Sequence, residues 1–501
     1  MGMKEQKPIL DLILENIVDG KLDENFTIPD DSEGPVKFAA GAMDGMCVYH
    51  MRPYEMTTED YNILEKSVAA VSKGDSEQTD KLWAELGKSA RAIQVVDQFQ
   101  QYIQEHADEI DVKAAYPCVF DIVCKSINKE SIKFALEFME LLDTSIEPVK
   151  KVIRTLSLSN EFTIFCAWII RNWENGNNEL FELAQKVDGW GRIHIIELLE
   201  PNTEEIRKWL LTEGTKNDVV YAYSALTCWE KSDAEERLYN SDLSYEEYSG
   251  LLTLTDALLD EGPVWGISKI DNADEILSDI VSRANEYTLS IDDYENIRRI
   301  SVSTNEKYPL GKQACDVLLL SDRCRLTVEK AITEGKGIEL ASLLGIDYKE
   351  SLMLSLEKDF HNNRFYCDKL LGDDAYTERV LDVFRNNLPF EEMVGEPQDS
   401  IAVGKDFDSS MTYQVLLQDL RDKPFVGTDI VLKGFQCRTL TCRNAALACV
   451  KKWVKLKKMQ LKELSPELFE AVSELYPAEP NENASETLKE LLEGKTDFSA
   501  D

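Results

Sequence analysis

Five apolar segments follow one another at nearly even spacing through the middle of the chain, and each has the periodicity of a helix. They are Ser131–Leu142, Asn160–Trp173, Gly189–Glu200, Asn217–Glu230 and Tyr245–Glu261. Their first residues lie 29, 29, 28 and 28 positions apart, and a polar turn and a more charged helical stretch follow each of the first four. Two helices in a unit of fixed length are typical of an α-solenoid. The pattern therefore predicts an all-α fold of stacked antiparallel helix pairs.

The polar turns carry residues that end one helix and start the next. Pro201 follows the Gly189–Glu200 helix, and it cannot continue that helix because it lacks a backbone N–H. Asn202 then stands where an N-cap is expected, and Glu205 lies at the offset of a capping box. Ser232 has the same place in the following unit. These signals predict a second helix directly after each turn.

The first helix of a unit is the more apolar of the two. On a helical wheel of Gly189–Glu200, one wide arc is formed by Ile195, Ile196, Leu198 and Leu199. The other side carries His194, Glu197 and Glu200. A single unit has too little apolar surface to fold alone, so we expect neighbouring units to stack on one another.

Several segments resemble HEAT repeats, a class of α-helical repeats related to armadillo repeats. In the best match, Arg192 lies near the start of a first helix, Glu200–Thr203 forms the polar turn, and Glu204–Leu211 forms the second helix. Lys88–Ile93 and Cys442–Ala448 show the same combination of Arg and small residues. The resemblance covers roughly half of the chain. It implies a HEAT-like α-solenoid.

In HEAT repeats the early Arg pairs with an acidic residue in the turn of the adjacent unit, and the resemblance implies this role for Arg192. The chain departs from the family pattern at Pro201 and Asn202, which replace the turn acid, and beyond Glu261, where the period becomes irregular. The lead-in Gly189–His194 is also similar to a segment of bacterial proteins labelled limonene hydroxylase. That similarity implies an oxygenase, although none of these residues explains such a chemistry.

Length and composition fit a large folded chain. Its 501 residues exceed one ordinary globular domain, but a solenoid core grows along one axis. The hydrophobic content of 43% is too high for a disordered chain. No apolar run approaches the roughly 18 residues of a membrane span, and Met1–Gln6 does not begin a signal peptide. We therefore expect a soluble, cytoplasmic protein.

The eleven cysteines are scattered singly along the chain, and the closest pair is Cys437 with Cys442. A zinc site usually needs two tight Cys pairs, and no Cys-x-x-Cys occurs. Cys166 and Cys228 lie in apolar helical segments, where cysteine acts as a small hydrophobic residue. The favoured interpretation is structural free thiols with no metal and no cofactor, and the alternative is a metal or redox site.

The charge balance favours a basic partner. Ninety-three acidic residues oppose 55 basic ones, which gives a net charge of −38. Such a field repels phosphate backbones, so we expect no nucleic-acid partner and no membrane partner. Lys451–Lys462 runs against this trend, with six lysines interleaved with Trp453, Leu456 and Leu461. We interpret it as the solvated face of a late helix that offsets the chain's own acids; the alternative is a docking site for an acidic surface.

Recognisable catalytic motifs are missing from the sequence. It contains four histidines and lacks the zinc-protease helix, the serine nucleophile elbow and the glycine-rich phosphate loops. His194 and Glu197 are three positions apart and could share a proton, but a packed or surface histidine is the more common outcome of this spacing. The sequence therefore argues against an enzyme without excluding one.

One segment near the start, Gly34–His50, differs from the repeats. Its glycines and alanines favour tight turns, and Val36–Phe38 and Met46–Tyr49 are predicted to pair as a β-hairpin. Asp44, Cys47 and His50 bring three chemically versatile side chains together within ten residues. The favoured interpretation is a terminal cap over the first repeat, and the alternative is a ligand-binding or catalytic loop.

The organisation is predicted in five parts. They are an N-terminal helix with the glycine-rich cap (1–55), regular repeats (56–261), irregular helical repeats (262–388), a loop-rich insertion (389–436) and a C-terminal repeat with an acidic tail (437–501). The insertion is expected to hold one short helix near Met411–Arg421.

Two functions from different classes follow. The first is a protein-binding solenoid or scaffold that sequesters a basic partner, as an immunity protein covers a nuclease toxin. The second is a hydrolase or an oxygenase with its site at the Gly34–His50 loop. Binding is expected through the concave face of the solenoid, whereas the enzyme hypothesis centres on Asp44, Cys47 and His50. The candidate binding residues are Asp44, Cys47, His50, Trp190, Arg192 and His194.

Overall fold

The computed structural model describes residues 7–29, 36–262, 264–304, 306–402 and 407–495. Over these residues the chain forms thirty α-helices joined by turns and short helical segments, with four strands of two residues each. The predicted all-α class is confirmed. Residues 34 and 35 of the predicted Gly34–His50 loop lie outside the described residues.

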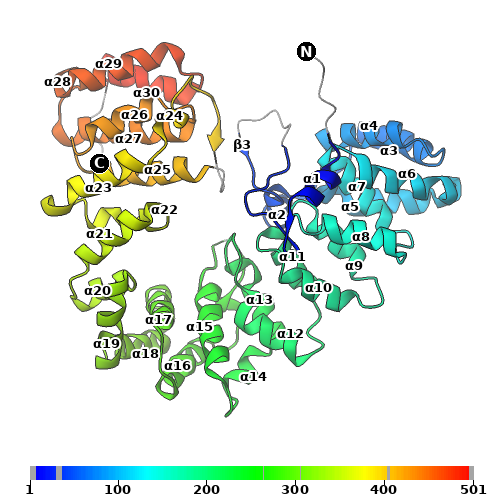
Figure 1. Cartoon of the computed structure of the whole chain (residues 1–501), viewed down its shortest axis with the longest axis horizontal. Helices are drawn as coiled ribbons and strands as arrows, with labels where there is room; N and C mark the ends of the chain where they lie inside the picture. Colours follow the sequence, from blue (N-terminus) through cyan, green and yellow to red (C-terminus); the bar gives the residue numbers. More distant parts are fainter. Residues whose placement is uncertain (1–6, 30–35, 263, 305, 403–406, 496–501) are drawn as a thin grey trace. The chain divides into compact units, whose positions relative to one another are not determined.

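The described residues divide into two compact units (Figure 1). Unit 1 contains residues 7–29 and most of 40–321, and unit 2 contains residues 36–39 and most of 322–495. The first elements of unit 1 are α1 (Ile9–Glu15), β1 (Ile17–Val18), β2 (Lys21–Leu22), α2 (Ala42–Tyr49), α3 (Thr58–Val71), α4 (Ser76–Ser89), α5 (Ala92–Glu105), α6 (Val112–Lys125), α7 (Lys129–Glu140) and α8 (Glu147–Leu156). They are followed by α9 (Thr163–Ile170), α10 (Gly176–Ala184), α11 (Trp190–Leu198), α12 (Glu204–Trp209), α13 (Ala222–Lys231), α14 (Ala234–Leu238), α15 (Tyr245–Leu259), α16 (Ala273–Arg283), α17 (Ile291–Thr304) and α18 (Pro309–Leu319).

Four of the five predicted apolar segments form α7, α9, α11 and α13, which pack on one another in sequence order. We call these four helices the first-helix row. Neighbours run in the same direction: the ring of Trp190 lies 4.8 Å from that of Tyr223 at one end, and the Lys231 Nζ atom donates a 3.1 Å hydrogen bond to the Ile196 carbonyl at the other. Apolar side chains between the helices form the core.

The fifth predicted segment, α15, takes a different place. Tyr221 and Ala222 at the start of α13 lie beside Asp256 and Asp260 at the end of α15, so these two helices are antiparallel. The helix between them, α14, has only five residues and is too short to cover the apolar side of α13. The fifteen-residue α15 covers that side instead.

The helix starts after the polar turns differ by one residue from the prediction. Thr203, and not Asn202, caps α12, because its hydroxyl accepts a 3.2 Å hydrogen bond from the Ile206 N–H. Asp233, and not Ser232, precedes α14, and its backbone is left-handed with φ of 55°. The turn residues were therefore located correctly, but the capping side chains were not.

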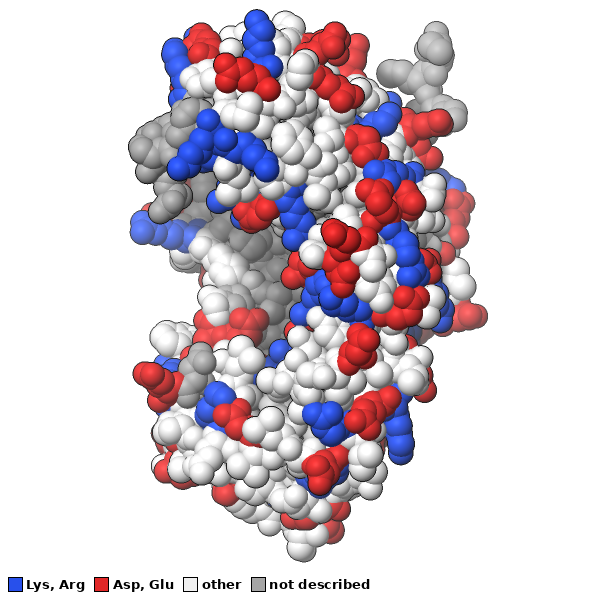
Figure 2. All heavy atoms as spheres, turned by 90° about the vertical axis from the view of Figure 1, so that its left-hand side faces the viewer, with Lys and Arg blue, Asp and Glu red and all other residues white. Residues whose placement is uncertain are grey.

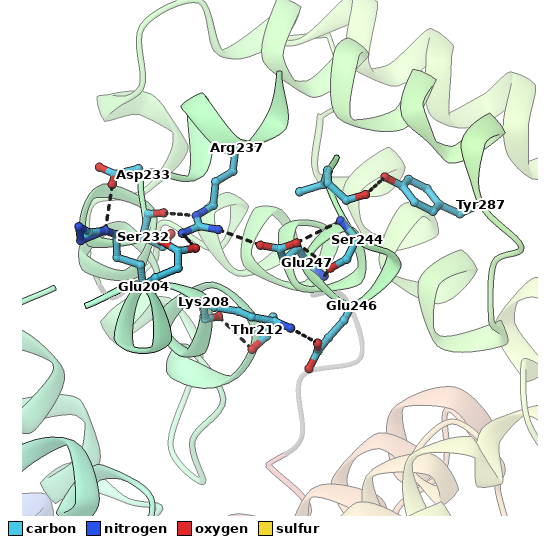
Figure 3. A network of polar contacts seen from close by, with 12 residues as sticks. Glu204, Lys208, Thr212, Ser232, Asp233, Arg237, Ser244, Glu246, Glu247 and Tyr287 are labelled. Atoms are coloured by element: carbon cyan, nitrogen blue, oxygen red, sulfur yellow. Dashed lines mark hydrogen bonds and ion pairs between the residues drawn. The ribbon is translucent and has the colours of Figure 1, made fainter. Parts of the chain in front are cut away.

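A polar network ties α12, α14 and α15 together (Figure 3). The Arg237 guanidinium lies 2.5 Å from Glu204 and 2.8 Å from Glu247. Glu247 also completes a capping box with Ser244 at the start of α15. The largely exposed side chain of Glu204 therefore links α12 to α14 through this ion pair.

Unit 2 begins with β3 (Val36–Lys37), which pairs in parallel with β4 (Ile401–Ala402). The predicted hairpin between Val36–Phe38 and Met46–Tyr49 is wrong, because Met46–Tyr49 belongs to the helix α2. The hairpin that does form near the N-terminus joins β1 and β2. Its turn is Asp19-Gly20, with φ of 50° and 80°, and positive φ at both positions is typical of a type I′ turn.

Unit 2 is otherwise helical. Its helices are α19 (Asp322–Ala331), α20 (Ile338–Leu344), α21 (Lys349–Lys358), α22 (Phe360–Asn363), α23 (Asp374–Asn387), α24 (Phe390–Met393), α25 (Asp408–Leu420), α26 (Thr428–Phe435), α27 (Leu440–Lys457), α28 (Leu461–Leu464), α29 (Pro466–Leu475) and α30 (Glu482–Glu493). The predicted short helix near Met411–Arg421 corresponds to α25, whereas α26 was not expected in the loop-rich insertion.

A buried ion pair anchors α27. The Arg443 guanidinium binds both carboxylate oxygens of Glu479, at 2.6 and 2.8 Å, and neither side chain is exposed. The same guanidinium donates to the carbonyl groups of Gln398, Cys437 and Arg438. A buried charge of this kind is stable only when it is fully paired, so Arg443 links three segments of unit 2.

Candidate functional site around helix α2

Helix α2 lies across the starts of the helices in the first-helix row. The Gly41 N–H, just before α2, donates a 3.1 Å hydrogen bond to Glu161, which lies just before α9. At Gly45, a Cβ atom would lie 2.1 Å from the Trp190 ring of α11. Only glycine permits this approach, so the backbone of α2 rests directly on α11.

The side chain of Asp44, on α2, is buried inside unit 1 and contacts Lys133 of α7. The Lys133 Nζ atom lies 2.8 Å from Asp44, 2.7 Å from Glu161 and 3.2 Å from Glu130. The side chains of Lys133 and Asp44 are only 1% and 2% exposed. One buried ammonium group therefore holds three carboxylates from three segments of the chain. We call these four residues the Lys133 cluster.

Burial and charge act in opposite directions within the Lys133 cluster. Burial raises the pKa of Asp44 to about 7, although Lys133 opposes that rise. Burial also disfavours ionisation of Glu161, but the Lys133 charge outweighs it and lowers the pKa of Glu161 to about 2. Glu161 is thus the ionised partner of Lys133, whereas Asp44 titrates near neutral pH.

Glu137 lies one turn beyond Lys133 on α7 and is also buried, with 1% exposure. Within the described residues, neither of its carboxyl oxygens has a hydrogen-bond partner. Burial, together with the charges of Glu130 and Glu140, raises the pKa of Glu137 well above its ordinary value. Burial therefore favours the protonated, neutral form of the Glu137 carboxyl group.

An aromatic cluster lies beside the C-terminal end of α2. The Tyr49 ring is 5.0 Å from the Tyr223 ring and 5.9 Å from the Trp190 ring. The exposed His50 makes a 2.7 Å hydrogen bond with the Tyr223 hydroxyl. His50 and Trp190, which were predicted as site residues from distant parts of the sequence, thus contact the same tyrosine.

His194 stacks on Tyr49, with ring centroids 6.0 Å apart. Burial lowers the pKa of His194 to about 4, so its ring is neutral at physiological pH. Glu197 accepts a hydrogen bond from the Tyr49 hydroxyl, and the His194 Nε2 atom has no partner in the described part of the chain. His194 is therefore a packed histidine, and the predicted alternative of a proton shared with Glu197 is not seen.

The remaining two predicted residues serve the packing. Burial raises the pKa of the Cys47 thiol, which disfavours a reactive thiolate. Arg192 lies 3.2 Å from Asp188, donates to the Glu213 carbonyl and stacks over the Trp209 ring. Asp188 precedes the same helix, so Arg192 does not pair with an acid of the adjacent unit as the HEAT resemblance implied.

An open groove lies next to the aromatic cluster. It is lined by the start of α13, the end of α15 and the end of α17, with Tyr221, Ala222, Asp256, Ala257, Asp260, Arg298, Arg299, Val302 and Ser303. Asp260 of the groove lies near Tyr223 of the aromatic cluster, and its charge, together with burial, raises the pKa of that tyrosine. The groove therefore lies beside the aromatic cluster. Tyr221 and Val302 are 41% and 60% exposed. We call this feature the α13–α17 groove.

Comparison of the chain with protein-family models, curated proteins and solved structures gives no match. The described residues contain no group of three or more His, Cys, Asp or Glu side chains placed to hold a metal ion. None of the described helices is both long and apolar enough to cross a bilayer.

The structure brings five of the six predicted residues to α2 and its contacts; Arg192 faces a different neighbourhood. The prediction missed Lys133, Glu130, Glu161 and Glu137. The sequence did contain a signal, because two charged residues stand in the otherwise largely apolar stretch Ser131–Met139. The structure shows that every residue of this stretch is buried. Charges in a helix that is apolar on all sides indicate buried ionic groups.

Proposed function

We propose that the protein is a HEAT-like α-solenoid that binds a basic protein or peptide partner through the α13–α17 groove. The parallel packing of the first-helix row supports a repeat architecture. The buried Arg443–Glu479 pair has the form that the HEAT resemblance implies for an early Arg. A location in the cytoplasm belongs to this proposal and is supported by eleven cysteines that are all free.

The observation that carries the proposal is the exposed Asp260 beside exposed apolar groups in the α13–α17 groove. The two arginines of the groove, Arg298 and Arg299, are paired with Glu295 and Asp256. Val302 and Tyr221 offer apolar contact area to a partner. Asp260 is exposed at the end of α15, whereas Asp256 is held by Arg299 at 2.5 Å. Asp260 is therefore the carboxylate best placed to receive a lysine or arginine of the partner.

The charge of the whole chain supports a basic partner. The net charge of −38 attracts cations over long range and accelerates their association. Figure 2 shows acidic and basic side chains interspersed on the face it draws. Part of the lysine-rich stretch is used internally, because Lys451 lies 3.1 Å from Glu490 and Lys452 lies 3.7 Å from Asp422. These contacts support the interpretation that the stretch offsets the chain's own acids.

The test uses a fluorescent peptide that alternates lysine and tyrosine, with a glutamate–tyrosine peptide as its counterpart. We expect the lysine peptide alone to bind, and we expect binding to weaken as salt shortens the Debye length to about 8 Å at physiological ionic strength. Asp260→Lys should reduce binding strongly. Glu205→Lys is the matched control, because Glu205 is exposed on α12 and does not line the groove. Equal loss in both variants would contradict the assignment of the groove.

An enzyme remains the second candidate because of one observation. Burial raises the pKa of Asp44 to about 7 and that of Glu137 well above its ordinary value, and a protonated carboxyl group is the state required of a general acid. This proposal places a hydrolase or oxygenase site at α2. Asp44→Asn would then abolish turnover while the Asp260→Lys variant keeps full activity.

A further inference from the structure

A groove with a volume of about 320 Å³ lies between α25 and α27 in unit 2. The Cys442 thiol donates a 3.6 Å hydrogen bond to the Ser410 carbonyl near the start of both helices. The Trp453 indole N–H donates a 3.1 Å hydrogen bond to the Leu420 carbonyl near the end of both. The two helices therefore run in the same direction, and the groove follows both of them. We call it the α25–α27 groove.

The lining of the α25–α27 groove is neutral apart from one residue. Leu417 and Ala448 contribute apolar surface, and Gln414 and Asn444 contribute carboxamide groups. Arg421, directly after the last residue of α25, is the one charged side chain among the described residues that line the groove. The chain as a whole has 93 acidic and 55 basic residues. A groove whose single charge is positive is therefore a local exception to the acidic character of the protein.

More positive charge lies at the same end of the groove. Lys452 and Lys455 lie one and two turns beyond Ala448 on the same face of α27. Lys452 is 3.7 Å from Asp422, whereas Lys455 has no carboxylate within ion-pair distance in the described part of the chain. The exposed Arg421 likewise forms no ion pair with a described residue. Arg421 and Lys455 are therefore able to receive an anionic group.

We propose that the α25–α27 groove binds a short extended peptide in which small residues are followed by acidic ones. The groove face of α27 from Thr441 to Lys455 is about 21 Å long at about 1.5 Å per residue. An extended chain advances about 3.3 Å per residue, so about six peptide residues span this length. Small side chains of the peptide pack on Leu417 and Ala448, and its carboxylates pair with Arg421 and Lys455.

The charges favour a peptide over other anionic partners. Nucleic acids and anionic membranes present many closely spaced phosphates, which the net charge of −38 repels. A peptide with two acidic residues brings only the charge that Arg421 and Lys455 neutralise. The inference is independent of the proposed function, because the α13–α17 groove belongs to unit 1 and is proposed to take a basic partner.

The first experiment measures binding of a fluorescent Ala-Ser-Ala-Ala-Glu-Glu peptide to the full-length chain by fluorescence polarisation. Arg421→Glu should weaken binding about tenfold or more, because it replaces a charge-assisted hydrogen bond by repulsion. Lys433→Glu is the matched control, since Lys433 is exposed on α26 and does not line the groove. Absence of binding to the natural chain, or an equal loss in both variants, would overturn the proposal.

A second experiment tests the apolar part of the groove. Ala448→Trp should abolish binding by filling the groove, and because Ala448 is exposed, the melting temperature should stay unchanged. An alternating glutamate–tyrosine peptide should not bind, because it has the acids without the small residues. Full binding by Ala448→Trp, or equal binding of the two acidic peptides, would show that the peptide lies elsewhere.

Two further probes separate the possible partners. Phosphatidylserine vesicles and a single-stranded oligonucleotide should not bind to the natural chain. If either bound and Arg421→Glu abolished that binding, the groove would be a site for phosphate-bearing partners and the proposal would be wrong. The lysine–tyrosine peptide should bind to Arg421→Glu as it does to the natural chain, so failure of this inference and failure of the proposed function are distinguishable.

Discussion

The Lys133 Nζ atom lies 2.8 Å from Asp44 Oδ2, and this contact joins α2 to α7 at a position where neither side chain reaches solvent. The two residues are 89 positions apart in the sequence. Because Lys133 also holds Glu130 and Glu161, removing it leaves several carboxylates without their counter-charge. The Lys133 cluster therefore determines how firmly α2 is attached to the first-helix row.

The first prediction concerns Lys133→Met, which keeps most of the length of the side chain and removes its charge. Breaking a buried ion pair from one side costs about 3–5 kcal/mol, and we expect a loss of this size in the free energy of unfolding from urea titration. Lys81→Met is the control, because Lys81 forms an exposed pair with Glu77 on α4. A loss for Lys133→Met no greater than that for the control would show that the cluster does not stabilise the fold.

The second prediction concerns pH and Glu137. The folded chain keeps the Glu137 proton at pH values where the unfolded chain has lost it, since the pKa is raised well above 4.5. The contribution of Glu137 to the free energy of unfolding is therefore greatest at low pH. It declines as the pH rises above the pKa that Glu137 has in the unfolded chain. Glu137→Gln removes that decline, so its unfolding free energy relative to the natural chain should improve from pH 5 to pH 8, by up to about 1.4 kcal/mol per pH unit.

Asp44→Asn is the matched variant for this pH series. The folded pKa of Asp44 is about 7, so its contribution declines between the unfolded pKa near 4 and pH 7 and then levels off. The relative stability of this variant should therefore improve between pH 4 and pH 7 and stop changing above pH 7. A relative stability that stays flat between pH 4 and pH 7 would contradict the raised pKa of Asp44.

The third prediction tests the contact between α2 and α11. Gly45→Ala places a methyl group where the Trp190 ring lies, and overpacking of this kind costs about 1–3 kcal/mol. We expect faster proteolysis near α2 and a change in tryptophan fluorescence. Gly372→Ala is the control, because no atom lies within 4 Å of the position that its Cβ would take, and its φ is not positive. Unchanged proteolysis of the Gly45 variant would mean that α2 does not rest on Trp190.

The fourth prediction concerns the core of the first-helix row. Ile195 is fully buried in α11, whereas Leu198 is half-buried, although both fall in the apolar arc of the helical wheel. Ile195→Ala should cost about 2–5 kcal/mol in thermal or urea unfolding, and Leu198→Ala should cost clearly less. The reverse order would place the core on the other side of α11.

The helices of unit 1 could be predicted because their apolar periodicity is strong, as α9 and α11 show. Helix α2 could not, because Asp44 and Gly45 have low helix propensity and packing on Trp190 overrides it. The place of α15 could not be predicted either, since it depends on the shortness of α14. The Asp19-Gly20 turn was predictable from its dipeptide and was overlooked.

The residues of the candidate site can likewise be divided into those that the sequence predicted and those that it did not. Asp44, His50 and Trp190 were found as versatile or aromatic residues, and the structure shows them around α2. Their partners Lys133 and Tyr223 were missed because ion pairing and ring stacking across the row depend on how helices far apart in sequence align. Periodicity indicates which face of a helix is buried, but it does not give the register between helices.

The buried Arg443–Glu479 pair has a consequence for how unit 2 comes apart. Glu479 lies in the connection before α30, so detaching that C-terminal segment would strip the paired carboxylate from a guanidinium with no access to water. Detachment of the segment that carries Glu479 is therefore coupled to the loss of α27. Unit 2 should unfold as one cooperative block, and a chain cut before Glu479 should fail to hold α27 in place.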